Sequence, residues 1–600
     1  MKFVKNLGGF IAAPALAVLL VTFFYQLWNC DLGTPVFGYG RDSLFHIFVI
    51  KTIINYGWFF QNDLVGFPHV DGSFYLYDFP IHSDAFNFLV IKFLALFSSD
   101  AFFVTNCFFI FTFALISLTT FVALRAFDVS AWTAVLIALL YSFLPYHLLR
   151  NVWHLFLSNY AVVPLSIMVG LWLADGKIKL LGVNEKQQFC LAPNRYFFIS
   201  LLVSIFAAAS GIYYAFYTII IFVFGWFFLS LRSGIFFERN FFAALMLCMA
   251  IIFSLFLLYL PSFIYWFEHG LNPYVANRHQ SDSEYHALKI IDLFMPASNH
   301  YLQYFQKLRI AFAEAVVGGE RAAEGLGLLG SAGFMFLLLW IFAKAQNGEK
   351  SFLQRTIKKF SLDSSQQNLV SNLASLNLLS VLFATAGGFV MFIVLPFPLL
   401  RSHARFCVFI AFFSLFLIAI IFDKMAREKV IAKFVLVAIT VLALLDQVGD
   451  IRNSRRELLA KIQNDFVIDR EFVAKVENSL PENSQLFVLP AFGFPEVIGD
   501  EYESLIFYLH SKKLGWSYPS ILGRPSDLWQ KEVVCLQAKD FVKELRKAGF
   551  SGIVIDRLHF AKIEKKDGWQ KLRALEKNLQ SLQLKIDAVS SDKRLVFLKI

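Results

Sequence analysis

Long apolar runs separated by short polar segments fill the first three quarters of the chain. The first run covers residues 9–28, and a helix needs about 20 apolar residues to cross the hydrocarbon core of a bilayer. This length indicates a retained first helix, preceded by Lys2 and Lys5, rather than a cleavable signal. Further runs predict spans at 101–124, 131–146, 157–173, 197–210, 213–231, 241–262, 326–343, 372–397, 405–422 and 429–446. The pattern therefore predicts a mainly α, polytopic membrane protein with about 11 transmembrane helices.

Composition and charge agree with this pattern. Hydrophobic residues make up 58% of the chain and charged residues 16%, as is typical of membrane proteins. The net charge of +10 does not indicate nucleic acid, because Lys and Arg concentrate in alternate short loops, as the positive-inside rule requires. We therefore expect a multi-pass protein of the bacterial inner membrane with a cytoplasmic N-terminus. The runs 197–210 and 213–231 could instead form one bent helix around Gly211, which would invert every later span.

Three longer regions then lie outside the cytoplasm, at 29–100, 263–325 and 447–600. In the first of them, the apolar segments 44–60 and 85–97 are interrupted by polar residues, which predicts helices lying in the membrane interface. The loop 263–325 is long enough to act as a flexible lid, and it could equally be a docking surface.

The composition changes after Asp450, where charge increases and long apolar runs end. The chain therefore divides into a membrane domain, 1–446, and a small extracytoplasmic α/β domain, 447–600. Strands are predicted at 485–489, 552–555 and 594–599, and an amphipathic helix at 538–548. This tail has neither a GxGxxG nor a Walker motif, so we do not expect it to bind a nucleotide. The six cysteines show no CxxC and no zinc-ligand spacing, which predicts no metal site.

The polar pair Arg41-Asp42 follows the turn Gly38-Tyr39-Gly40 and precedes the first interfacial segment. A carboxylate at the outer membrane boundary can act as a general base toward an acceptor hydroxyl or amine. A cation beside it can hold a lipid phosphate. The alternative is that Asp42 only caps the helix that starts after it, because Asp is a favoured N-cap residue.

The order of these elements resembles the N-terminal module of the GT-C glycosyltransferases over roughly residues 1–175, and the rest of the chain does so more loosely. Among bacterial members, the sequence is most similar to the YfhO-like group, which also has a late outer turn like 400–406 and an extracytoplasmic α/β tail. The features that carry the resemblance are the first span, Asp42, the interfacial helix, Tyr77-Asp78-Phe79-Pro80, the second short helix, Ser99-Asp100-Ala101, Phe127-Asp128-Val129-Ser130 and Leu144-Pro145-Tyr146-His147.

The resemblance implies transfer of a sugar from a polyprenyl-phosphate-linked donor to an envelope glycolipid, polysaccharide or protein, with inversion at the anomeric carbon. Asp42 matches the first-loop acidic residue of the family. Many relatives pair it with a second acid, but here the neighbour is Arg41 and the second outer loop has no acid. Asp78 and Glu320 are therefore candidates for the second catalytic acid, and a requirement for a divalent cation such as Mg or Mn stays open.

Other candidates follow from position. Basic residues at outer helix ends can hold the donor phosphate, although each could merely snorkel to the interface: Arg41, Arg150, Arg401, His403 and Arg405. Aromatic and hydrogen-bonding residues of the outer loops and tail are candidates for substrate binding: His69, Tyr77, His82, His147, Tyr508, His510 and Trp516. For those in the tail, the alternative is an aromatic loop that holds the small domain together.

Two other functions fit a polytopic chain. A lipid or polysaccharide transporter would carry polar residues inside its spans, and these spans are almost free of charge. A GT-C-like scaffold could also serve as a non-catalytic envelope assembly factor. Loss of transfer on changing Asp42 would separate the enzyme from the scaffold.

Overall fold

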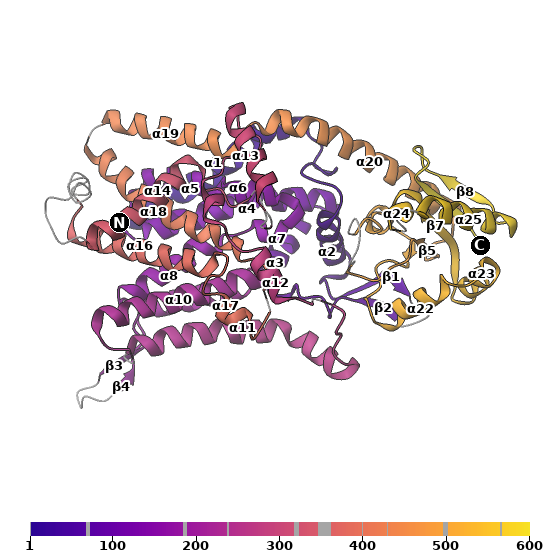
Figure 1. The fold of residues 1–600 in the computed structure, drawn as a ribbon, viewed down its shortest axis with the longest axis horizontal. Coiled ribbons are helices and arrows are strands. Elements are labelled where there is room, and N and C mark those ends of the chain that lie inside the picture. The colour runs from indigo at the N-terminus through magenta and orange to yellow at the C-terminus, as the bar shows by residue number, and fades with distance from the viewer. Residues whose placement is uncertain are drawn as a thin grey trace.

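Apolar helices form a bundle whose two ends are covered differently (Figure 1). A domain that contains the larger sheet covers one end, and the N-terminus lies at the other. The computed structural model describes residues 2–67, 72–183, 189–236, 239–275, 277–316, 318, 323–345, 362–398, 400–428, 430–495, 502–563 and 567–600. We call the bundle end that meets the sheet domain the loop face, because the first loop lies there.

Within those residues, eight helices are long and apolar enough to cross a membrane, and two more are shorter. The mainly α, polytopic fold is therefore confirmed. The bundle helices are α1 (Lys2–Tyr25), α4 (Ala101–Arg125), α5 (Ala131–Ser142), α8 (Val162–Ala174), α9 (Arg195–Ala208), α10 (Ile212–Ser233), α11 (Arg239–His269), α14 (Gly327–Ala345), α16 (Ser364–Ala384), α18 (Cys407–Glu428) and α19 (Val430–Val448). The run 372–397 is the one misplaced prediction, because α16 begins earlier and ends before a turn at Gly387 and Gly388.

Helices α9 and α10 are two separate spans. The Asn194 side chain before α9 donates to the carbonyl oxygen of Lys177 (2.8 Å), beyond the far end of α8. At the other end of α9, Gly211 has φ of 112°, and its N–H donates to the carbonyl oxygen of Ser83 in the first loop (2.8 Å). The chain therefore crosses the bundle along α9 and turns back at Gly211 into α10. The alternative of one bent helix is excluded.

The tail and the first loop share one sheet. Its seven strands are ordered β2-β1-β6-β5-β7-β9-β8. The strands β5, β7 and β9 confirm the sequence prediction, but β1 and β2 come from the first loop, and Val65 of β1 pairs in parallel with Trp516 of β6. The bounds are β1 (Gln61–Phe67), β2 (Gly72–Tyr75), β5 (Gln485–Leu489), β6 (Gly515–Trp516), β7 (Phe550–Asp556), β8 (Ile586–Val589) and β9 (Leu595–Lys599).

Further helices surround this sheet and the loop face. In the tail they are α20 (Ile451–Ser479), α21 (Leu505–His510), α22 (Pro525–Val533), α23 (Ala538–Lys547), α24 (Arg557–Ile563) and α25 (Gly568–Ser581). At the loop face they are α2 (Asp42–Tyr56), α3 (Ala85–Ala95), α6 (Pro145–Arg150), η3 (Asn151–His154), α7 (Leu155–Ser158), α12 (Gln280–Tyr285), α13 (Gln303–Ala315), α17 (Met391–Val394) and η5 (His403–Phe406). Helix α20 runs along one side of the molecule from the bundle to the sheet (Figure 1).

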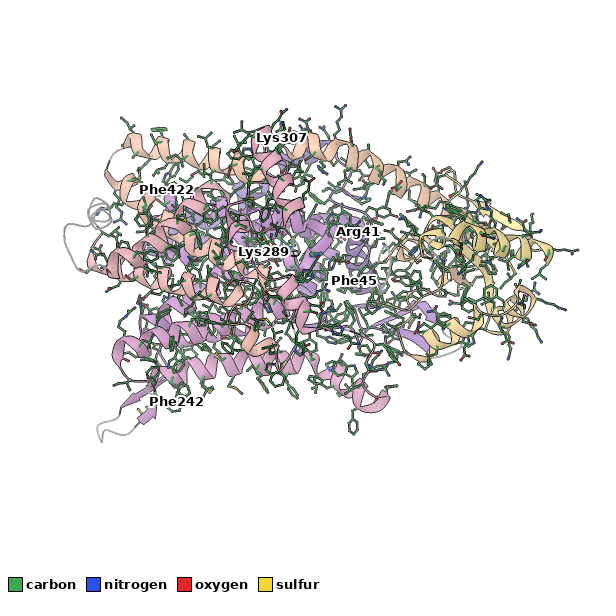
Figure 2. All side chains as sticks on the ribbon, viewed as in Figure 1. Arg41, Phe45, Phe242, Lys289, Lys307 and Phe422 are labelled. Carbon is green, nitrogen blue, oxygen red and sulfur yellow. The ribbon has the colours of Figure 1, made fainter. Side chains whose placement is uncertain are left out.

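Helix α2 does not lie on the membrane interface, contrary to the sequence prediction. Phe45 and Phe48 are buried, and the ring of Phe45 packs against those of Phe494 and Tyr502 of the tail, at 5.4 and 5.5 Å. Figure 2 shows Phe45 where the bundle meets the sheet domain. The tail therefore covers the apolar side of α2 that the sequence suggested would face lipid. Helix α3 leaves Leu89 exposed, which is compatible with an interfacial position.

The arrangement predicts which exposed positions a membrane-impermeant maleimide reaches. In a Cys535→Ser background, a cysteine replacing Ser581 in α25 should react in intact spheroplasts. A cysteine replacing Ser365, at the opposite end of the bundle, should react only after permeabilisation, because the bilayer separates the two ends. Mass spectrometry of the labelled protein measures both. Reaction of the Ser365→Cys variant in intact spheroplasts would contradict the predicted orientation.

Candidate functional site

The turn before α2 leaves the Asp42 carboxylate available. Helix α2 begins at Asp42, and Arg41 occupies the N-cap position with φ of 48° and no side-chain capping bond. In the part of the chain that the structure describes, no backbone N–H donates to the Asp42 carboxylate. Asp42 is therefore not the helix cap, and this alternative from the sequence is wrong.

Asp42 faces η3, the segment that follows α6 at the loop face. Its Oδ2 lies 3.2 Å from Nδ1 of His154 in η3, and its side chain is 34% exposed, so a substrate can reach it. Burial alone would raise the pKa of Asp42, but the hydrogen bond with His154 and the charges of His46 and Arg401 outweigh it and lower that pKa. The carboxylate is therefore ionised and accessible.

Three of the predicted phosphate-binding arginines gather around this pair. Arg401 interacts electrostatically with Asp42, and Arg150 and Arg405 interact with His154. The guanidinium of Arg405 lies over the ring of Tyr213, at 4.3 Å from its centre. Arginine suits this place, because its planar donors bind phosphate oxygens while its face stacks on an aromatic ring.

A fourth arginine, Arg278, belongs to the outer loop 263–325. Burial together with the neighbouring charges of Arg401 and Arg405 lowers the pKa of Arg278. Like charges this close repel one another, and a bound anion would relieve the repulsion. We call Arg150, Arg278, Arg401 and Arg405 the arginine cluster. Arg278 was not selected from the sequence, because nothing in the spacing of that loop relates it to the helix ends.

A second carboxylate lies near the arginine cluster. Glu324, directly before α14, is 2% exposed and interacts electrostatically with Arg150 and Arg309. Burial raises its pKa, and neither of its carboxylate oxygens has a hydrogen-bond partner among the described residues. The sequence prediction chose Glu320 for this role, which lies outside the described residues, as does His69. The missed signal is an acidic residue at the junction of a loop with a predicted span.

Asp78, the other candidate for the second acid, is fully engaged elsewhere. Arg524 of the tail binds both of its oxygens, at 2.8 and 2.9 Å. Trp266 of α11 and Asn272 donate to the same carboxylate, at 2.9 and 3.1 Å. Asp78 therefore links the first loop to α11 and to the tail.

Tyr77 and His82 pack the first loop against α11. The ring of Tyr77 stacks on those of Phe60 and Tyr265, each at 5.0 Å. His82 is buried, with Nε2 at 3.0 Å from the hydroxyl of Ser262. These contacts hold the first loop against α11.

The remaining candidate site residues differ in how exposed their side chains are. Arg41 is exposed at the boundary between bundle and sheet domain (Figure 2), and its backbone N–H donates to Glu503 (3.4 Å). Four others are buried: His147, His403, Tyr508 and Trp516. His510 is half-buried, and its ring packs against those of Phe102 and Phe466. Tyr508 and Trp516 therefore lie in the protein interior, as the alternative of an aromatic loop predicts.

The need for a divalent cation stays a prediction. The side chains that act on the charge of Asp42 are His46, His154 and Arg401, which supply none of the several oxygen ligands that Mg²⁺ prefers. Among the described residues, no three His, Cys, Asp or Glu side chains come together as metal ligands would. The chemistry proposed below uses no metal.

No protein-family model matches the sequence, and no curated protein sequence matches it. Among solved structures, the chain is similar to ArnT from Cupriavidus metallidurans bound to undecaprenyl phosphate, with 10% identity, a TM-score of 0.49, and 99% of this chain and 98% of that chain covered. It is also similar to the Archaeoglobus fulgidus oligosaccharyltransferase in the apo form, with 12% identity, a TM-score of 0.44, and 92% and 70% covered. Likeness at this level bears on neither activity nor substrate.

The links of Asp78 predict a stability effect. Asp78→Asn should lower the free energy of unfolding by about 3 kcal/mol, because it leaves the Arg524 guanidinium without its buried partner charge. The midpoint of thermal unfolding in detergent should fall accordingly. The matched control is Asp63→Asn, at an exposed position of β1, which should stay within about 0.5 kcal/mol of the unmodified protein. Equal midpoints for the two variants would contradict the assignment.

Proposed function

We propose that the protein is a membrane glycosyltransferase of the GT-C type, which transfers a sugar from a polyprenyl-phosphate-linked donor to an acceptor of the cell envelope. The observation that carries this proposal is the ionised, partly exposed Asp42 carboxylate beside the arginine cluster at the loop face. A base next to several phosphate-binding cations is the arrangement that transfer from a sugar phosphate requires.

In the proposed reaction, a hydroxyl or amine of the acceptor attacks the anomeric carbon of the donor sugar. The bond from that carbon to the phosphate oxygen breaks, and the phosphate leaves with the electron pair. Asp42 accepts the proton that the acceptor loses. The arginine cluster stabilises the charge that develops on the leaving phosphate. His154 holds the Asp42 carboxylate in one orientation through their hydrogen bond.

Glu324 takes the place of Asp78 and Glu320 as the second acid in this proposal. Burial raises the pKa of Glu324 and outweighs the opposing charge of Arg150, which favours the neutral carboxylic acid, and this acid can donate a hydrogen bond to a polar group of the substrate. The membership in the YfhO-like group and the periplasmic position of the tail also belong to the proposal. Their support is the sequence resemblance and the placement of Lys and Arg.

The first prediction concerns the donor. The purified protein in detergent should transfer sugar from polyprenyl-phosphate sugars to an envelope lipid extract, and nucleotide sugars alone should give no product. The reason is that the site offers phosphate-binding cations at the membrane boundary, and the tail lacks the nucleotide motifs. Mass spectrometry of the product, compared with the envelope glycolipids of cells with and without the gene, identifies sugar and acceptor. Transfer from a nucleotide sugar without a lipid intermediate would refute this donor.

The second prediction concerns the base. Asp42→Asn should lower turnover by about a hundredfold or more, because it removes the group that accepts the proton while keeping the size of the side chain. Protein abundance and binding of polyprenyl phosphate should be retained. Asp63→Asn, an exposed aspartate of the same loop, should leave turnover unchanged. Near-normal turnover by Asp42→Asn would remove Asp42 as the base.

A further inference from the structure

The turn that carries Asp42 is bound by the tail through Tyr39. The hydroxyl of Tyr39 donates to Oδ2 of Asp469 in α20 (2.8 Å), and Nε2 of His510 lies 2.8 Å from the same hydroxyl. Asp469 is 2% exposed, so this bond is shielded from water. Only two residues separate Tyr39 from Asp42 in the chain.

Arg594 links Asp469 to the sheet of the tail. Its guanidinium binds the second oxygen of Asp469, and its Nη1 binds Oδ2 of Asp556 at the end of β7 (2.8 Å). Asp469 and Asp556 are both buried, which makes the contacts costly to break. The position of Asp469, and through it that of Tyr39, is therefore set by the core of the tail.

The turn has little freedom on its other side. A Cβ on Gly38 would lie 2.8 Å from the side chain of Val152, in the segment that carries His154. Gly40 has φ of 124°, which non-glycine residues rarely adopt, and the Ser43 hydroxyl donates to its carbonyl oxygen (2.6 Å). The turn therefore fits between the bundle and the tail with no room to shift.

We propose that the tail positions the catalytic base, with Tyr39, Asp469 and Arg594 as positioning residues for Asp42. This inference rests on the proposed function, in which Asp42 must meet an acceptor and a donor at once. A displacement of about 1 Å at a reacting group can cost about a hundredfold in rate. A loosened turn would therefore slow transfer without changing the cations that hold the donor phosphate.

The test compares Tyr39→Phe, Asp469→Asn and the double variant in the full-length protein. Each should form the gene-dependent glycoconjugate about tenfold more slowly, because Asp42 is less often in place. The dissociation constant for polyprenyl phosphate in detergent should change less than about twofold, because the arginine cluster is untouched. The double variant should be no slower than the slower single variant, because both changes break the same contact. The matched control is Tyr56→Phe at the far end of α2, which should behave like the unmodified protein.

The outcomes separate this inference from the proposed function. Normal product formation by Tyr39→Phe, with Asp42→Asn inactive, overturns the positioning role and leaves the proposed function standing. Normal product formation by Asp42→Asn removes Asp42 as the base and overturns the positioning role with it, whereas no gene-dependent product from the unmodified protein overturns the proposed function. If Tyr39→Phe loses polyprenyl-phosphate binding or thermal stability in proportion to its loss of product, the contact only holds the fold together and the positioning role is overturned. A product loss in the double variant that equals the two single losses combined also overturns it.

Discussion

The parallel pairing of β1 with β6 is the contact on which the rest of the loop face depends. Unpaired backbone groups at a sheet edge are costly once covered, so a strand that joins the edge satisfies both partners. By pairing with the tail, the first loop brings α2 beneath it. Lys51 of α2 then donates to the carbonyl oxygens of Tyr508 and Ser511, both at 2.6 Å. The site is therefore built between two parts of the chain that are remote in sequence.

The surroundings of the two carboxyl groups at this site set their protonation states. The His154 bond keeps Asp42 ionised despite partial burial, whereas Glu324, which has no such partner, is shifted toward its neutral form. The protonation states of Asp42 and Glu324 differ because of their surroundings, so the sequence could not predict which of the two is ionised. The like charges of the arginine cluster repel one another, and a bound phosphate would relieve that repulsion, so the proposed donor binding and the state of Asp42 are coupled electrostatically.

Much of the bundle could be predicted from the sequence, because the length and polarity of each apolar run reflect the bilayer. Asp42, Arg150, Arg401 and Arg405 could be found in the same way, since they stand where a span meets a loop. The burial of α2 could not, because periodicity does not tell lipid from protein as the apolar partner. Trp516 looks like part of a ligand surface in the sequence, and the pairing of β1 with β6 explains why it is inside. Arg278 depends on how a long loop folds back, for which the sequence holds no local pattern.

The shared sheet also sets an order of events during synthesis. Strand β1 and helix α2 leave the ribosome long before residue 516, so the strand waits without its partner while Phe45, Phe48 and Phe67 lack the cover they have in the finished protein. Domains made early usually fold early, but this loop face can be completed only after β6 has been synthesised and has reached the same side of the bundle. A nascent chain that lacks the tail therefore cannot assemble the surroundings of Asp42 seen in the finished protein.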